Sequence, residues 1–282
     1  MNDDGTPKSD NGPIRTGHPT GKPITSSLRA TNRLLRSTGS WRANFRGLGY
    51  GLVLVMATGL TMFFLCFVLM IPMRVVHLIA LLLYAPLSTA WTHVVIAAPA
   101  PHKSLFSRMR PLRTIYLATW FPTFLMWAAT HTAMVLPSLL RRAIGLPDLT
   151  DPYAVQDRTS ASDIAKMLCV VGFSLALNLL LVIPTQAALS RVKASLLPAD
   201  EDTIVPFDRS FAGRVEPEVV SGKGFATFGA AIKTIPVSGW VRIFLMRVKV
   251  FFVGLVVYTA VSAVVVAQLM LLGKKAEGGD GQ

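Results

Sequence analysis

The side chains that most often hold metals or act as nucleophiles are few in this sequence of 282 residues, which contains five histidines and two cysteines. The histidines form no HxxxH or HxxHH pattern, the spacing typical of di-iron membrane enzymes. Cys66 and Cys169 lie in separate apolar runs without CxxC or Cys/His spacing, so neither a zinc site nor a disulfide is expected. HExxH, GxSxG and GxxxxGK[ST] are absent as well. The sequence therefore predicts no catalytic residue, no metal and no cofactor, and it leaves enzyme activity undecided, with the balance against it.

Several polar side chains interrupt otherwise apolar runs, and three of them are candidates for contacts between helices: His77, His131 and Asn178. At about 1.5 Å per helical residue, His77 and His131 would lie in the same half of a membrane and could approach each other. A polar side chain in lipid seeks a hydrogen-bonding neighbour. We therefore expect all three to make single hydrogen bonds between helices. A His77–His131 pair with chemistry of its own is the less favoured alternative.

A basic loop carries the arginines best placed to meet lipid. Arg108, Arg110 and Arg113 follow an apolar run and precede another, where an anionic headgroup could be held. If the chain modified a membrane lipid, the reaction would need a general base on the cytoplasmic side, and His102 and Asp208 would be the only candidates.

An acidic, proline-punctuated loop is the least generic part of the chain. Asp200, Glu201 and Asp202 are consecutive, and an apolar-Pro-aromatic run ending at Asp208 follows them. Such a stretch could dock a basic or apolar protein surface. A solvated linker without a partner is the favoured interpretation of the loop.

The composition of the chain predicts which kind of secondary structure positions these residues. The chain is 52% hydrophobic and 15% charged, with mean hydropathy +0.50, whereas a soluble domain averages about 25% charged residues. Long uncharged runs exclude an ordinary soluble enzyme and predict an all-α integral membrane protein. The net charge is +13, and the basic residues flank these runs. The expected partners are therefore the lipid bilayer with its anionic headgroups and a protein. Nucleic acid is not expected as a partner.

The apolar runs predict a bundle of about five transmembrane helices, and four spans with one re-entrant piece is the main alternative. Pro86, Pro122 and Pro184 fall within spans and should kink them. The predicted spans are residues 48–73, 75–98, 114–140, 164–189 and 250–272.

Between and around the spans we expect less regular structure. Residues 1–46 should form a basic, mostly disordered tail with a short amphipathic helix within 24–46. The first four spans occupy 47–189. Residues 190–249 should form a cytoplasmic loop with an interfacial helix at its end, because Pro236 and Gly239 should prevent one continuous helix there. Residues 273–282 should be a disordered tail.

The distribution of cations predicts the orientation. If the N-terminus is cytoplasmic, 21 of the 28 Lys and Arg lie on the cytoplasmic side and 7 on the other. The positive-inside rule therefore favours a cytoplasmic N-terminus. The sequence does not indicate which membrane holds the protein.

Residues 195–215, SLLPADEDTIVPFDRSFAGRV, resemble a segment of fungal multi-pass membrane proteins of unassigned activity, some of which carry a label as ubiquitin carrier or conjugating proteins. The resemblance implies a membrane protein and supplies no catalytic residue. A conjugating enzyme needs an accessible thiol, whereas both thiols here fall inside predicted spans.

These observations together favour a membrane component without a catalytic site, an organising or adaptor protein acting through helix contacts and its cytoplasmic loop. A carrier or channel for a neutral or lipid-like small molecule is the first alternative. An enzyme acting on a membrane lipid is the second.

Overall fold

The computed structural model describes residues 28–39, 43, 45–99, 109–146, 160–198, 200–205, 207–215 and 224–277. Over these ranges every regular element is a helix, and the sole β pairing is an isolated bridge between Ala97 and Thr203. The predicted all-α class is confirmed. The chain divides into two units, Met1–Asn44 and Phe45–Gln282.

The first unit contributes one helix, α1 (Leu28–Gly39). Arg29, Arg33 and Arg36 are exposed, whereas Leu34 and Leu35 are half-buried. This is the amphipathic pattern that the sequence predicts for this segment. The predicted disorder of the preceding tail lies outside the described residues.

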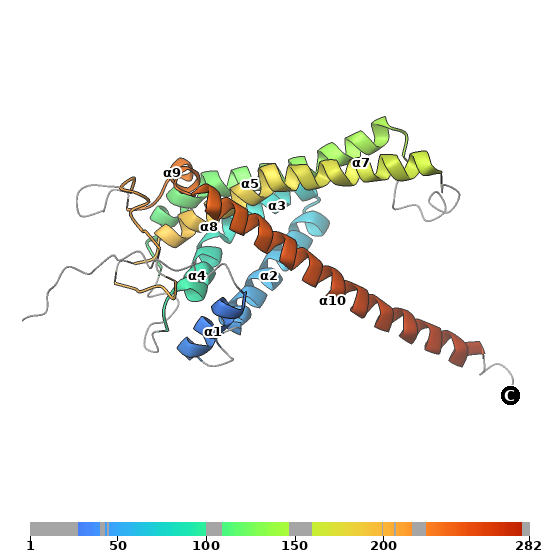
Figure 1. The fold of residues 1–282 in the computed structure, drawn as a ribbon, viewed down its shortest axis with the longest axis horizontal. Helices are drawn as coiled ribbons and strands as arrows, with labels where there is room; N and C mark the ends of the chain where they lie inside the picture. The colour runs from blue at the N-terminus through green and yellow to red at the C-terminus, as the bar shows by residue number, and fades with distance from the viewer. Residues whose placement is uncertain are drawn as a thin grey trace, which may run out of the picture. The chain divides into compact units, whose positions relative to one another are not determined.

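Within the described part of the second unit, four helical segments are long and apolar enough to cross a membrane (Figure 1). Two of these segments contain a π-helical turn. A further pair of helices is bent by 55° at Tyr84, and it makes a fifth span if both helices together cross the membrane. The integral membrane assignment therefore stands, with four or five spans. The segments are α2 (Leu48–Phe63) with η3 (Phe64–Val68), the bent pair α3 (Met73–Leu83) and α4 (Ala85–Ile96), α5 (Leu112–Ala143), α7 (Ala161–Leu177) with η5 (Asn178–Val182) and α8 (Ile183–Ser195), and α10 (Val237–Glu277).

The three prolines predicted to kink the spans behave differently. Pro86 sits in the first turn of α4, immediately after the 55° bend, where its missing N–H cannot continue the ladder of α3. Pro184 lies in the first turn of α8, directly after the π turn η5. Pro122 lies inside α5, which continues through it as one helix.

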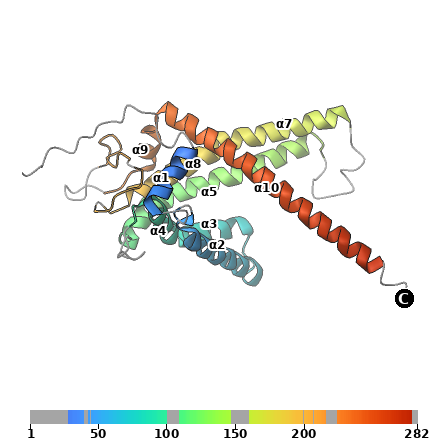
Figure 2. The ribbon, with the colours of Figure 1, turned by 60° about the horizontal axis from the view of Figure 1, so that its bottom comes forward.

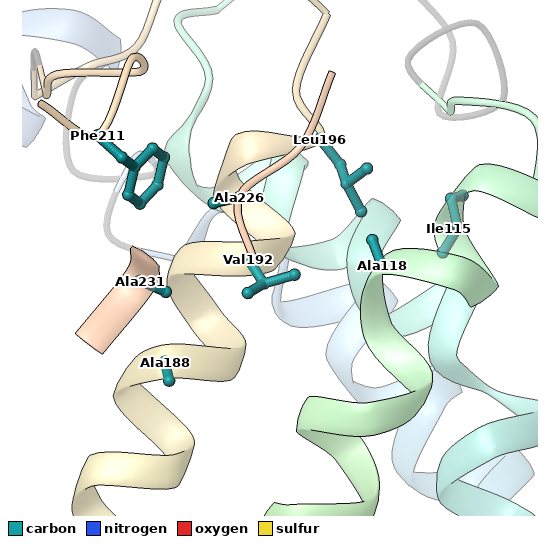
Figure 3. Packing of buried hydrophobic residues seen from close by; sticks show 8 residues of the cluster. All are labelled: Ile115, Ala118, Ala188, Val192, Leu196, Phe211, Ala226 and Ala231. Carbon is teal, nitrogen blue, oxygen red and sulfur yellow. The ribbon is translucent and has the colours of Figure 1, made fainter. Parts of the chain in front are cut away.

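The core lies where α5 and α8 meet the loop that follows α8. In Figures 1 and 2, α5 runs alongside α7 and α8. Alanines at the contact let the helix backbones approach closely. The loop adds Phe211, and the short helix α9 (Phe228–Lys233) adds one more alanine. Figure 3 shows the eight buried members: Ile115, Ala118, Ala188, Val192, Leu196, Phe211, Ala226 and Ala231.

The structure divides the segment before residue 250 at Pro236, as predicted, but not at Gly239. α9 ends at Lys233, a short connection follows, and α10 then runs without interruption from Val237. Pro236 precedes the helix, where a missing N–H leaves no bond unmade, and its carbonyl accepts from the N–H groups of Gly239 and Trp240 at 2.8 and 3.1 Å. Pro236 therefore separates α9 from α10, whereas Gly239 lies inside α10.

Candidate functional site: the capped end of the bundle

The acidic loop is ordered against the end of α4. We call its described part, within residues 196–215, the cap. The N–H of Ala98 donates to the carbonyl of Asp202 at 2.7 Å, and the N–H of Ile204 donates to the carbonyl of Ile96 at 3.0 Å. Arg209 donates to the carbonyls of Pro198, at 2.9 Å, and Glu201. This part of the loop is therefore an ordered part of the fold, and its binding of a partner stays a prediction.

A tight turn in the cap is held by one carboxylate. Asp208 accepts from the backbone N–H and the hydroxyl of Ser210, at 2.9 and 2.6 Å, and from the N–H of Ala212 at 2.7 Å. These bonds, that of the Ser210 hydroxyl first, hold the pKa of Asp208 below its ordinary value. Three consecutive residues, Phe211, Ala212 and Gly213, have φ of 49, 57 and 74°. The carboxylate thus stabilises a left-handed stretch that two residues with a Cβ would otherwise avoid.

That turn delivers an aromatic side chain into the core. Phe211 is 1% exposed and packs among the small residues of α8 and α9 (Figure 3). The guanidinium of Arg191 lies 4.8 Å from the centre of its ring, a cation–π distance. Arg191 also donates to the carbonyl of Ala231 at 2.9 Å. One cation therefore joins the cap, α8 and α9.

The four acids predicted to bind a partner take different positions. Asp200 and Asp202 are exposed, whereas Glu201 between them is 6% exposed. Side chains alternate along this extended segment, which the Ala97–Thr203 bridge fixes against α4. Glu201 consequently faces the protein, so its place in a partner-binding set is wrong. The carboxylate of Asp208 is exposed but already bonded within its own turn.

Beneath the cap, α4 and α8 are joined by buried polar side chains that the sequence reasoning did not assemble. The ammonium of Lys193 donates to the hydroxyl of Ser88 at 2.6 Å, and Nε2 of His93 lies 2.9 Å from the carbonyl oxygen of Lys193. His93 and Thr89 are completely buried. Their i, i+4 spacing was the available signal, because it places both on one face of a helix.

The structure contains the predicted contact between His77 and His131 but not the one predicted for Asn178. The structure brings Nδ1 of His77 on α3 within 3.2 Å of Nε2 of His131 on α5, and Trp127 packs against His131 with ring centres 4.9 Å apart. The interhelical contact predicted for Asn178 is wrong. Its amide donates to the carbonyl of Ser174 on its own helix at 2.9 Å, because Asn178 begins a π turn and the neighbouring backbone accepts locally.

A pocket of about 430 Å³ lies beside the capped end. Its walls come from the N-terminal half of α5 and from the segment that leads into α9. Of the arginines predicted to hold a headgroup, Arg113 is exposed and Arg110 half-buried at this end of α5, and Arg108 lies outside the described residues, as does His102. The lining residues are Thr114, Leu117, Ala118, Phe121, Pro122, Phe225, Thr227 and Phe228.

Among the described residues no three His, Cys, Asp or Glu side chains gather closely enough to hold a metal ion. The chain matches no family model, no curated protein and no solved structure. The chemistry of the site must therefore be argued from its own geometry.

Proposed function

We propose that the protein is an organising or adaptor component of its membrane that presents the cap to a protein partner with a basic surface. The observation that carries this proposal is the exposure of Asp200 and Asp202 on a segment whose backbone is bonded to α4. A segment already ordered before binding loses little conformational entropy when a partner docks.

Charge supports a protein partner for this surface over lipid. The two carboxylates would be repelled by the anionic headgroups that the surrounding cations attract. An Arg or Lys side chain on a partner would instead be complementary to them, and such complementarity sets specificity and association rate. The proposal includes the orientation in which the N-terminus and the cap face the cytoplasm.

The test is co-purification of the tagged full chain from its own membrane in mild detergent. Changing both Asp200→Asn and Asp202→Asn should reduce a stoichiometric partner, because both carboxylates lose their charge while their size is kept. The matched control, Asp200→Glu with Asp202→Glu, keeps both charges and should retain the partner. Equal partner recovery from the Asn pair and the Glu pair would refute a docking role for these acids.

A carrier for a neutral or lipid-like molecule is the second candidate, favoured by the bend between α3 and α4. At that bend the hydroxyl of Tyr84 lies 2.7 Å from that of Thr61 on α2. A span broken in mid-membrane can line a path, since freed backbone groups find partners there. Uptake into vesicles that depends on the purified protein and falls with Tyr84→Phe would favour this candidate; unchanged uptake would count against it.

A further inference from the structure

The pocket between α5 and α9 has the composition of a site for a hydrocarbon chain. Leu117, Phe121 and Phe228 form its apolar walls. The rings of Phe121 and Phe228 meet edge to face with centres 5.9 Å apart. Leu117 and Phe121 remain 57% and 43% exposed, so the pocket opens towards the surroundings of α5. Its volume of about 430 Å³ falls within the ordinary range of small-ligand sites.

The position of the pocket along α5 places it at the level where lipid headgroups meet the hydrocarbon. α5 has 32 residues and is therefore about 48 Å long, whereas the hydrocarbon core is about 30 Å thick. A helix centred in the core thus extends beyond it at both ends. Thr114 lies in the first turn of α5 and Pro122 well inside, so the pocket begins among the headgroups and ends among the acyl chains. The exposed Tyr116 and Trp120 on the same stretch suit that boundary.

The charge beside the pocket selects the headgroup. Arg113 is exposed and directly precedes Thr114, which lines the pocket. Lys233 is exposed at the other end of α9. Neither α5 nor α9 contains an acidic residue. A phosphate near the first turn of α5 would therefore meet Arg113 without a competing carboxylate from α5 or α9.

The size of the pocket argues against a partner helix. A helix is about 10–12 Å across, so about one helical turn would fill such a volume. An extended chain fits it better, and in a membrane the abundant extended apolar chain is the acyl chain of a lipid.

We propose that this pocket binds one acyl chain of an anionic phospholipid whose phosphate lies against Arg113. This site is separate from the exposed carboxylates of the cap. The lipid test uses the purified protein alone, so its failure would leave the partner proposal standing, and the reverse also holds.

The test is photocrosslinking of the purified full chain in phosphatidylcholine vesicles that contain phosphatidylserine with a diazirine in one acyl chain. Crosslinked peptides should contain residues 114–122 or 225–228, and unlabelled phosphatidylserine should compete better than added phosphatidylcholine. Thr114→Trp should abolish this crosslink, because the larger side chain fills the pocket. Arg113→Gln should weaken competition by about fivefold, since it removes one cation near an anionic lipid.

Two controls on the same helix separate the site from general lipid contact. Leu139→Trp and Arg142→Gln make the same kinds of change at the far end of α5, where both residues are exposed, and both should leave the crosslink unchanged. Because Arg113 is on the surface, its variant tests the proposal even if Thr114→Trp fails to fold. Crosslinks elsewhere, equal competition by both lipids, or no response to Arg113→Gln would each overturn the assignment.

Discussion

The capped end of the bundle and α10 handle apolar side chains in opposite ways. At the capped end Phe211 is 1% exposed, whereas Phe251 and Phe252 of α10 are 60% and 58% exposed. Along Val237–Gln268 of α10 no residue is buried. Four of the eight members of the buried core are alanines. In a membrane protein, hydrophobicity therefore marks what meets lipid, and close approach of small residues marks what meets protein.

The strongest test of this difference is to remove one phenylalanine ring from each region and to compare the free energies of unfolding. Phe211→Ala should lower the free energy of unfolding by about 3–5 kcal/mol, because it empties a fully packed position. Phe251→Ala should change it by less than about 0.5 kcal/mol, because the ring touches little of the chain. Thermal or denaturant unfolding of both variants in detergent measures this. A comparable loss for Phe251→Ala would mean that α10 packs against protein.

A smaller difference in the free energy of unfolding is expected between variants of His93 and His131. His93→Ala should cost about 2–3 kcal/mol, because a fully buried ring and its bond to the Lys193 carbonyl are both lost. The matched change His131→Ala should cost about 1 kcal/mol, since the lost bond joins two half-buried side chains within the membrane. The same unfolding measurement compares them. The comparison fails if His131→Ala proves the more damaging.

The smallest expected effect concerns the turn in the cap. The ionised carboxylate of Asp208 accepts three bonds, and its pKa lies below the ordinary value of 3.8. Its stabilisation of the turn is therefore complete above pH 3.8 and is lost as the pH falls through the lowered pKa. Asp208→Asn should remove this pH dependence and weaken the turn at neutral pH.

Hydrogen exchange of the cap amides, from neutral pH down to about pH 3, checks the effect of Asp208→Asn after correction for the intrinsic exchange rate. Because the carboxylate is largely exposed, the loss should be confined to the cap. Asp202→Asn, an exposed acid outside this turn, is the control and should leave the exchange profile unchanged. Identical profiles for Asp208→Asn and the natural chain would contradict the role assigned to Asp208.

The features of the fold that could be predicted are those that depend on the sequence pattern within a single helix. Long uncharged runs were enough to predict the spans, and Pro86 indicated the bend between α3 and α4. Pro236 indicated the break between α9 and α10. Gly239 was misinterpreted as a second break, because a single glycine costs a helix only about 1 kcal/mol and the rest of α10 tolerates it.

Contacts between distant parts of the chain were the unpredictable part. The bond between His93 Nε2 and the Lys193 carbonyl joins residues 100 positions apart, and no local pattern indicates which carbonyl a buried imidazole will meet. The burial of Glu201 follows from the pairing of the cap with α4. An acidic triplet looks uniformly solvated until that pairing fixes which side chain points inwards.

The π turn η5 has a consequence for the kinds of sequence change that this protein can tolerate. A π turn amounts to one extra residue in an α-helix, and every residue after it is rotated by about 100° relative to a helix without it. Val192 and Lys193 reach the core and Ser88 from the far side of that turn. Loss of a single residue between Asn178 and Val182 would leave the hydropathy of the span almost intact and still turn α8 away from the cap. Length within this span should therefore be inherited more strictly than residue type.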